Sequence, residues 1–115
     1  MISPGRSEGS LDIAARVAAA RALQAERFEP LAVSARTNAQ APARLIEDIA
    51  ELDADGVRLL RDAADMLHLS ARGYHRVLKV ARTLADLDGE ARVRRPHLAE
   101  ALSYRGAPTT LAHAA

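Results

Sequence analysis

The fold is decided by the stretch from Leu69 to Leu87, LSARGYHRVLKVARTLADL. On a wheel of about 3.6 residues per turn, this stretch separates into an apolar side and a charged side. The apolar side holds Tyr74, Val77, Leu78, Ala81, Leu84 and Ala85, and the charged side holds Arg72, Arg76, Lys79 and Asp86. This pattern predicts an amphipathic helix, the longest regular one in the chain.

The two ends of this predicted helix carry termination signals. Ser70 is a residue whose hydroxyl accepts a hydrogen bond from a free backbone N–H of the first turn. At the other end, Asp88-Gly89 provides a residue that adopts the left-handed conformation and stops the helix.

Arg72 breaks the local rule, because a cation in the first turn faces the positive end of the helix dipole at a cost of about 0.3 to 1 kcal/mol. The other long predicted helices begin with acids instead, at Asp12 and at Asp53 with Asp55. Free N–H groups and a guanidinium at one helix end favour phosphate binding. The alternatives are that Arg72 extends into solvent or pairs with Asp65.

The composition describes one domain with a helical core. The chain has 115 residues, a net charge of +1 and no cysteine, so neither a disulfide framework nor a dominant electrostatic partner is expected. No apolar run approaches a membrane span, and the first residues lack a signal-peptide centre. We therefore expect a cytoplasmic protein without a membrane partner. Aromatic residues make up 3%, and aliphatic cores of this kind are usually helix on helix.

The remaining elements follow from periodicity and from breaking residues. The predictions are a linker or disordered end over residues 1–9, helices from Ser10 to about Arg27, from Ala43 to Ala50, from Asp53 to about Leu67, and from His97 to about Tyr104 after Pro96, and a disordered tail over residues 106–115. A long connection, residues 29–41, offers Leu31 and Val33 to cover the core. The sequence thus predicts an all-α bundle of four or five helices, with the third and fourth as antiparallel neighbours.

Residues 69–87, followed by HLAEALSYR at residues 97–105, resemble the C-terminal helical domain of magnesium chelatase-like AAA+ ATPases of the ComM type. RVAAAR at residues 16–21 and TNA at residues 37–39 match that family more loosely. The resemblance covers about residues 11–105, so we draw the helical domain as residues 10–105. It implies the fold of a lid behind a nucleotide-binding core.

The resemblance also implies a site. The arginine of the family's Ser-Ala-Arg motif is the second sensor, which contacts the ATP phosphates, and it corresponds to Arg72. Arg76, one turn along the same face, is the weaker second candidate. The expected cofactor is ATP, with Mg²⁺ held by the AAA+ core and not by this domain. The expected partners are that core in the same polypeptide and neighbouring ring subunits, so Arg72 acts on its own or on the adjacent subunit's ATP.

The chain lacks the parts that hydrolyse ATP on their own. No Gly-rich phosphate loop precedes its single lysine, Lys79, and no acidic pair follows an apolar strand. We therefore expect a piece of a larger ATPase or a separate lid-like protein. The resemblance implies that a ComM-type parent is a hexameric motor acting on DNA, whereas chelatase relatives insert magnesium into a porphyrin.

Two other classes of function remain open from the residues. A basic stripe of Arg72, Arg76 and Lys79, with Arg92, Arg94 and Arg95, would suit nucleic-acid phosphates, although Asp86 interrupts it. A helical protein-interaction module without any nucleotide role is the other. The four histidines show no second pair at ligand spacing, so no metal site is expected.

Overall fold

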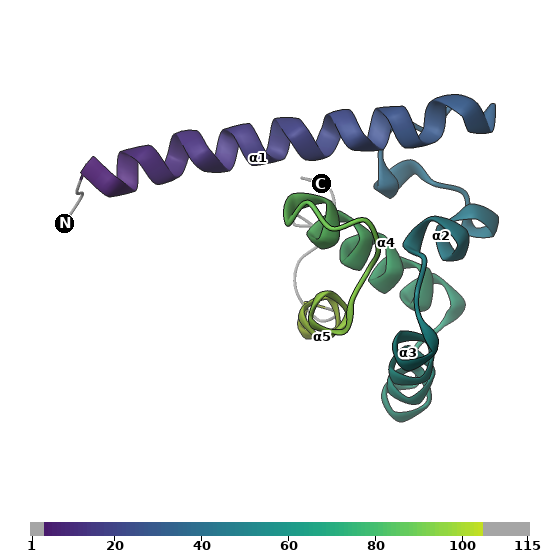
Figure 1. The fold of residues 1–115 in the computed structure, drawn as a ribbon. Coiled ribbons are helices and arrows are strands. Elements are labelled where there is room, and N and C mark those ends of the chain that lie inside the picture. Colours follow the sequence, from purple (N-terminus) through teal and green to yellow (C-terminus); the bar gives the residue numbers. More distant parts are fainter. Residues whose placement is uncertain (1–3, 105–115) are drawn as a thin grey trace.

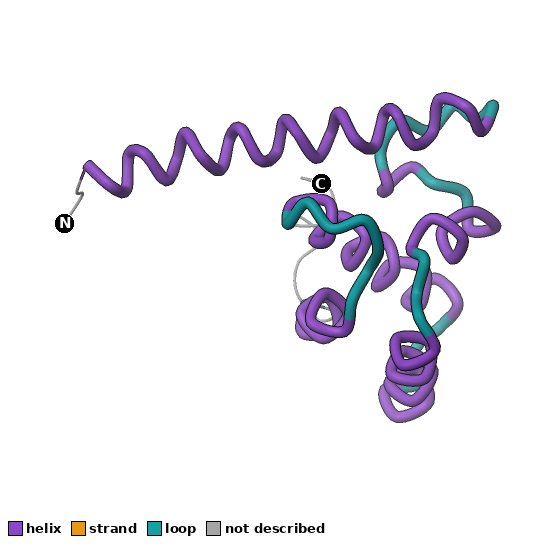
Figure 2. Tube along the Cα trace, in the orientation of Figure 1, coloured by secondary structure: helices purple, strands orange, loops and turns teal. Residues whose placement is uncertain are grey.

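The computed structural model describes the backbone of residues 4–104 and side chains from Leu11 onward. This part of the chain forms helices and connecting turns without a strand (Figures 1 and 2). The elements are α1 (Pro4–Phe28), the 3-10 turns η1 (Glu29–Leu31) and η2 (Asn38–Gln40), α2 (Ala43–Ala50), α3 (Ala54–Leu67), α4 (Ala71–Leu87) and α5 (Arg95–Ser103). The all-α prediction is confirmed.

The first helix begins earlier than its sequence pattern indicated. α1 starts at Pro4, whereas we predicted a linker over residues 1–9 and a helix from Ser10. Proline is tolerated in a first turn, and an established helix extends by one hydrogen bond for each residue added. The periodic side chains that marked the helix simply start later than its backbone. The predicted tail, residues 106–115, lies outside the described residues.

The later helices match their capping signals. Asp53 Oδ1 accepts a hydrogen bond from the Gly56 N–H (2.7 Å) at the start of α3. Ser70 Oγ accepts one from the Gly73 N–H (3.1 Å) at the start of α4. Gly89 follows α4 with a φ of 72°, the left-handed conformation that we predicted for the stop signal.

α4 lies at the centre of the bundle and contacts α1, α2, α5 and η2 (Figure 1). The prediction that the third and fourth helices are close antiparallel neighbours is wrong in its packing, because α3 makes its main contact with α5. The short link turns sharply at His68, whose φ is 53°. A short loop therefore keeps the ends of two helices close together, but it does not determine which helices pack against each other.

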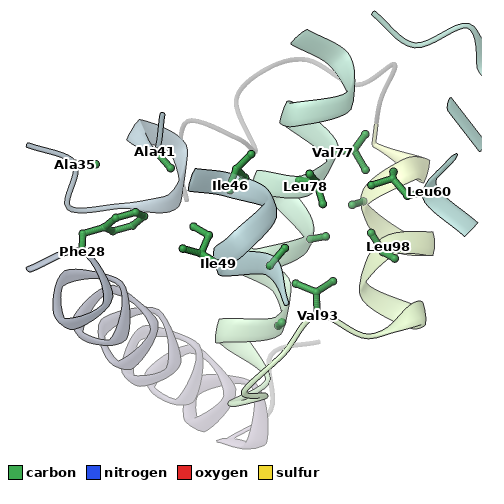
Figure 3. Packing of buried hydrophobic residues seen from close by; sticks show 14 residues of the cluster. Phe28, Ala35, Ala41, Ile46, Ile49, Leu60, Val77, Leu78, Val93 and Leu98 are labelled. Atoms are coloured by element: carbon green, nitrogen blue, oxygen red, sulfur yellow. The ribbon is translucent and has the colours of Figure 1, made fainter. Parts of the chain in front are cut away.

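The core fills the space on two sides of α4 (Figure 3). Leu60 of α3 and Leu98 of α5 lie near Val77, and all three side chains are buried. On the other side, the buried core residues are Phe28, Ile46, Ile49 and Leu78. The connection contributes Val33 to the core, as predicted, whereas Leu31 is 39% exposed.

Packing around α4 also corrects our assignment of its faces. The wheel put Asp86 on the charged, solvent-facing side, but Asp86 is only 3% exposed. Arg82 is fully buried as well. A helix covered by three others has more than one buried face, so a single apolar stripe understates what it buries.

No helix in the described part of the chain has the length and apolar character needed to cross a membrane.

Candidate phosphate-sensing site

Arg72 occupies the first turn of α4, and its side chain is exposed. The first turn contains no acid, and no described residue forms a hydrogen bond or ion pair with Arg72. The alternative pairing with Asp65 is therefore not formed within residues 4–104. The guanidinium and the positive end of the helix dipole lie together at the surface, and both favour an anion.

Arg76 lies one turn further along α4 and is half-buried. It borders a shallow pocket of about 120 Å³, the other lining residues of which are Leu69, Gly73, Val77, Val80, Ala101 and Tyr104. Residues four apart on a helix have neighbouring Cβ atoms, so Arg72 and Arg76 form one basic edge of α4. The structure thus brings together the two site residues that the sequence suggested.

Three other residues of the predicted basic stripe are engaged within the fold, whereas Arg95 is exposed. Lys79 Nζ donates to the Ala39 carbonyl (3.1 Å), and Arg92 Nε donates to the Glu51 carbonyl (3.1 Å). Arg94 lies 3.6 Å from a carboxylate oxygen of Glu90. These contacts leave a shorter free basic surface than the sequence indicated.

His97 serves as a cap, and its two ring nitrogens are both occupied. Its Nδ1 accepts a hydrogen bond from the Arg94 N–H (2.9 Å), and its Nε2 lies 2.9 Å from Asp88 Oδ2. Asp88 also approaches Arg16 of α1, at 3.5 Å. Among the described residues, no group of three potential ligands is placed to hold a metal ion. His113 lies outside those residues.

Sequence reasoning missed a buried polar cluster around Asp86. Arg27 of α1 binds this carboxylate with two parallel hydrogen bonds, from Nη1 to Oδ2 (2.9 Å) and from Nη2 to Oδ1 (2.6 Å). Arg82 Nη2 lies 3.1 Å from Oδ1. Asn38 Nδ2 donates to Oδ2 (2.9 Å). Asp86 therefore joins α1, the connection and α4.

Asn38 completes the cluster from the connection. Its side-chain oxygen accepts from Arg27 (3.0 Å), its amide donates to Thr83 (3.1 Å), and its backbone N–H donates to Gln24 (2.8 Å). Asn38 belongs to the TNA segment at residues 37–39, which was part of the family resemblance. That segment was the available signal, although nothing in its sequence identifies its partners.

Arg82 is held by backbone as well as by charge. It donates to the carbonyls of Ile49 (3.0 Å), Ala91 (3.1 Å) and Glu90 (2.9 Å). Its Nε has no partner within the described residues. Burial lowers the pKa of the Arg82 guanidinium, and Asp86 beside it offsets part of this effect. Through these hydrogen bonds, Arg82 connects the loop after α4 with the end of α2.

The cluster is distant from the candidate site. Asp86 and Arg72 are separated along α4 by about 21 Å, at about 1.5 Å per residue. The cluster therefore fixes how the helices are arranged, and the exposed arginine at the opposite end of α4 is the residue available to a ligand.

Comparisons with known proteins find relatives over nearly the whole chain. The model of the family described as "Magnesium chelatase, subunit ChlI C-terminal" matches residues 7–105. Competence protein ComM of Haemophilus influenzae is 41% identical over 100 residues, which cover 87% of this chain and 18% of that protein. The YifB protein of Salmonella typhimurium is 38% identical over 108 residues, 94% of this chain and 20% of that protein.

A Mycobacterium tuberculosis protein, Rv2897c, is 36% identical over 103 residues, 90% of this chain and 20% of its own length. The chain thus spans about a fifth of the length of the curated relatives that it matches. No solved structure matches the chain.

Proposed function

The chain belongs to the family of magnesium chelatase subunit ChlI C-terminal domains, and we propose that it is the lid of an AAA+ ATPase in which Arg72 senses the phosphates of ATP. The observation that carries this proposal is the exposed Arg72 in an acid-free first turn of α4. This arginine lies in the Ser-Ala-Arg segment that resembles the family's second sensor. Similarity to ComM supports a ComM-type parent.

In this mechanism, the domain supplies charge and the rest of the ATPase supplies the nucleotide site. ATP and Mg²⁺ bind to the AAA+ core, and the Arg72 guanidinium stabilises negative charge that develops on the transferred phosphoryl group. Arg76 is the second candidate, because it lies one turn away on the same edge. Because Arg76 is half-buried, it is better placed to support Arg72 than to contact the phosphates itself.

The parent is proposed to be a cytoplasmic, ring-forming ATPase. The partners of this domain are then the AAA+ core and a neighbouring subunit. Movement of the lid when phosphate leaves would transmit the state of the nucleotide to the ring. DNA is the proposed substrate of a ComM-type parent, and the alternative is a true magnesium chelatase, for which the same arginine chemistry holds.

The test is ATP hydrolysis by the complete AAA+ protein that carries this domain, with Arg72→Ala and Arg72→Lys. An arginine placed on the transferred phosphoryl group contributes about three to five powers of ten in rate. We expect Arg72→Ala to lose turnover on this scale, and Arg72→Lys to restore little, because lysine lacks the planar fork of donors. Circular dichroism should be unchanged, since Arg72 forms no hydrogen bond or ion pair with a described residue.

Arg44→Ala is the matched control, because Arg44 is also exposed, on α2, and has no hydrogen bond or ion pair to the described residues. Unchanged turnover in the Arg72→Ala protein would refute the sensor assignment. If the same variant instead lowered DNA affinity and its salt dependence, the nucleic-acid alternative would be favoured.

Mixing experiments would separate the two geometries of action. Arg72→Ala subunits combined with subunits that cannot bind ATP regain turnover if Arg72 acts on the neighbouring subunit's nucleotide. They remain inactive if it acts on its own.

A further inference from the structure

The groove between α4 and α5 is lined mainly by apolar residues. Leu69, Val77 and Val80 line it from the α4 side, and Ala101 and Tyr104 line it from the α5 side. Its volume of about 120 Å³ is about four times the share of one water molecule in the liquid. This is room for one large apolar side chain.

Exposed apolar side chains occur at the rim of the groove and shortly before it in the sequence. Tyr104 at its rim is 37% exposed. Met66, in the last turn of α3 and three residues before Leu69, is 78% exposed, the highest value among the large apolar side chains described. A groove whose rim exposes an apolar side chain is a candidate protein-binding site.

The edge of the groove is positively charged. Arg76 is the charged residue among those that line it, and Arg72 lies one turn away. Neither forms an ion pair with an acid in the described part of the chain. By contrast, Lys79 on the same side of α4 donates to a carbonyl. An apolar groove beside two unneutralised guanidinium groups is complementary to a segment that is both apolar and acidic.

We propose that this groove binds an acidic protein segment that carries one large apolar side chain. The apolar side chain fills the space between α4 and α5, and a carboxylate that flanks it pairs with Arg76. A nucleic-acid strand fits less well, because a phosphate backbone needs a row of free cations and Lys79 is already engaged. The proposal goes beyond the sensing of ATP and does not depend on it.

Gly73 gives a way to close the groove while preserving the fold. A Cβ atom at Gly73 would lie 3.4 Å from Ser70 Oγ and 3.7 Å from Leu69 Cδ2, which are ordinary contacts. Gly73 also lies within α4, where a residue with a side chain forms helix more readily. Gly73→Leu is therefore expected to fold and to place its side chain in the groove.

The experiment measures binding of fluorescent peptides to the full chain by anisotropy. The probe is a peptide of glutamates with leucine at every third or fourth position, and its charge-reversed partner has lysine in place of glutamate. We expect the glutamate peptide to bind and the lysine peptide not to bind. Arg76→Glu should weaken binding at least tenfold, and Gly73→Leu should abolish it.

Two controls make the result specific. Ala99→Leu adds the same side chain at an exposed position of α5 and should leave binding unchanged, while Arg44→Glu makes the same charge reversal on α2. Absence of glutamate-peptide binding, equal binding of both peptides, or wild-type binding by Gly73→Leu would overturn the proposal. A further variant, Leu111→Ser, tests whether the chain's own C-terminal segment occupies the groove. If the glutamate peptide bound this variant and not the wild type, that segment would be the occupant, and the proposal would again be wrong.

Discussion

Asp86→Asn should be among the most destabilising conservative substitutions in this domain. The Asp86 side chain has no solvent exposure. It accepts hydrogen bonds from the Arg27 guanidinium and from Asn38, and it forms an ion pair with Arg82 at 3.1 Å. Asparagine has nearly the same shape, but it removes the negative charge and turns an NH₂ group toward donors. Arg82, whose side chain is also 0% exposed, is then a buried cation without a counter-charge.

The expected loss is about 3 to 5 kcal/mol, the usual cost of removing one partner from a buried ion pair. A domain of this size has a free energy of unfolding of about 5 to 15 kcal/mol, so roughly a fifth or more of its stability would be lost. In thermal unfolding, the same loss corresponds to a Tm lower by roughly 15 °C.

Urea unfolding followed by circular dichroism measures this effect, and the midpoint should fall at an unchanged m value. Asp55→Asn is the matched control, because its partner Arg58 lies 3.7 Å away and both side chains are mostly exposed; we expect a change below about 0.5 kcal/mol. Arg27→Gln should fall between the two, at about 1.5 to 3 kcal/mol, since Asp86 keeps Arg82. An Asp86→Asn protein within about 1 kcal/mol of wild type, or more stable than Arg27→Gln, would refute this account.

Three further predictions concern the helix ends and one half-buried phenol. Gly89→Ala should cost about 1 kcal/mol in urea unfolding through backbone strain, because φ is 72° and the Cβ would meet open space; an unchanged midpoint would contradict this. Ser70→Ala should cost about 1 kcal/mol, since Gly73 N–H loses its acceptor, and unchanged helix stability would argue against the cap. Burial is the main cause that raises the pKa of Tyr74, and Glu47 adds to the effect. The neutral phenol therefore stabilises the folded state fully below about pH 10. This contribution is lost as the pH rises further, because Tyr74 ionises first in the unfolded chain. Tyr74→Phe should reduce that alkaline loss in urea unfolding measured as a function of pH, and an identical pH profile would count against the assignment.

Local signals in the sequence predicted the helices because each signal acts within a few residues. Ser70 and Asp53 cap through the third residue that follows, and Gly89 stops α4 by its own conformation. Arg72 was found for the same reason, since a cation in a first turn is a local misfit. Its exposure agrees with that reasoning, and its phosphate role stays a prediction.

Partnerships between distant residues could not be read from the same signals. Arg27 and Asp86 are 59 residues apart, and Asn38 and Thr83 are 45 apart. Periodicity predicts that a helix has a buried side, but it does not give the number of neighbours that cover it. Asp86 was therefore assigned to solvent, and α3 to the wrong neighbour.

The sharing of Asp86 among α1, the connection and α4 has a consequence for how this domain diverges over time. A substitution at position 27, 38 or 82 changes which residues are tolerated at position 86, because all three side chains contact one carboxylate. Single changes at these positions should be rare among related domains, and replacements should occur as compensating sets. Although these positions are scattered through the sequence, we expect them to change together during evolution.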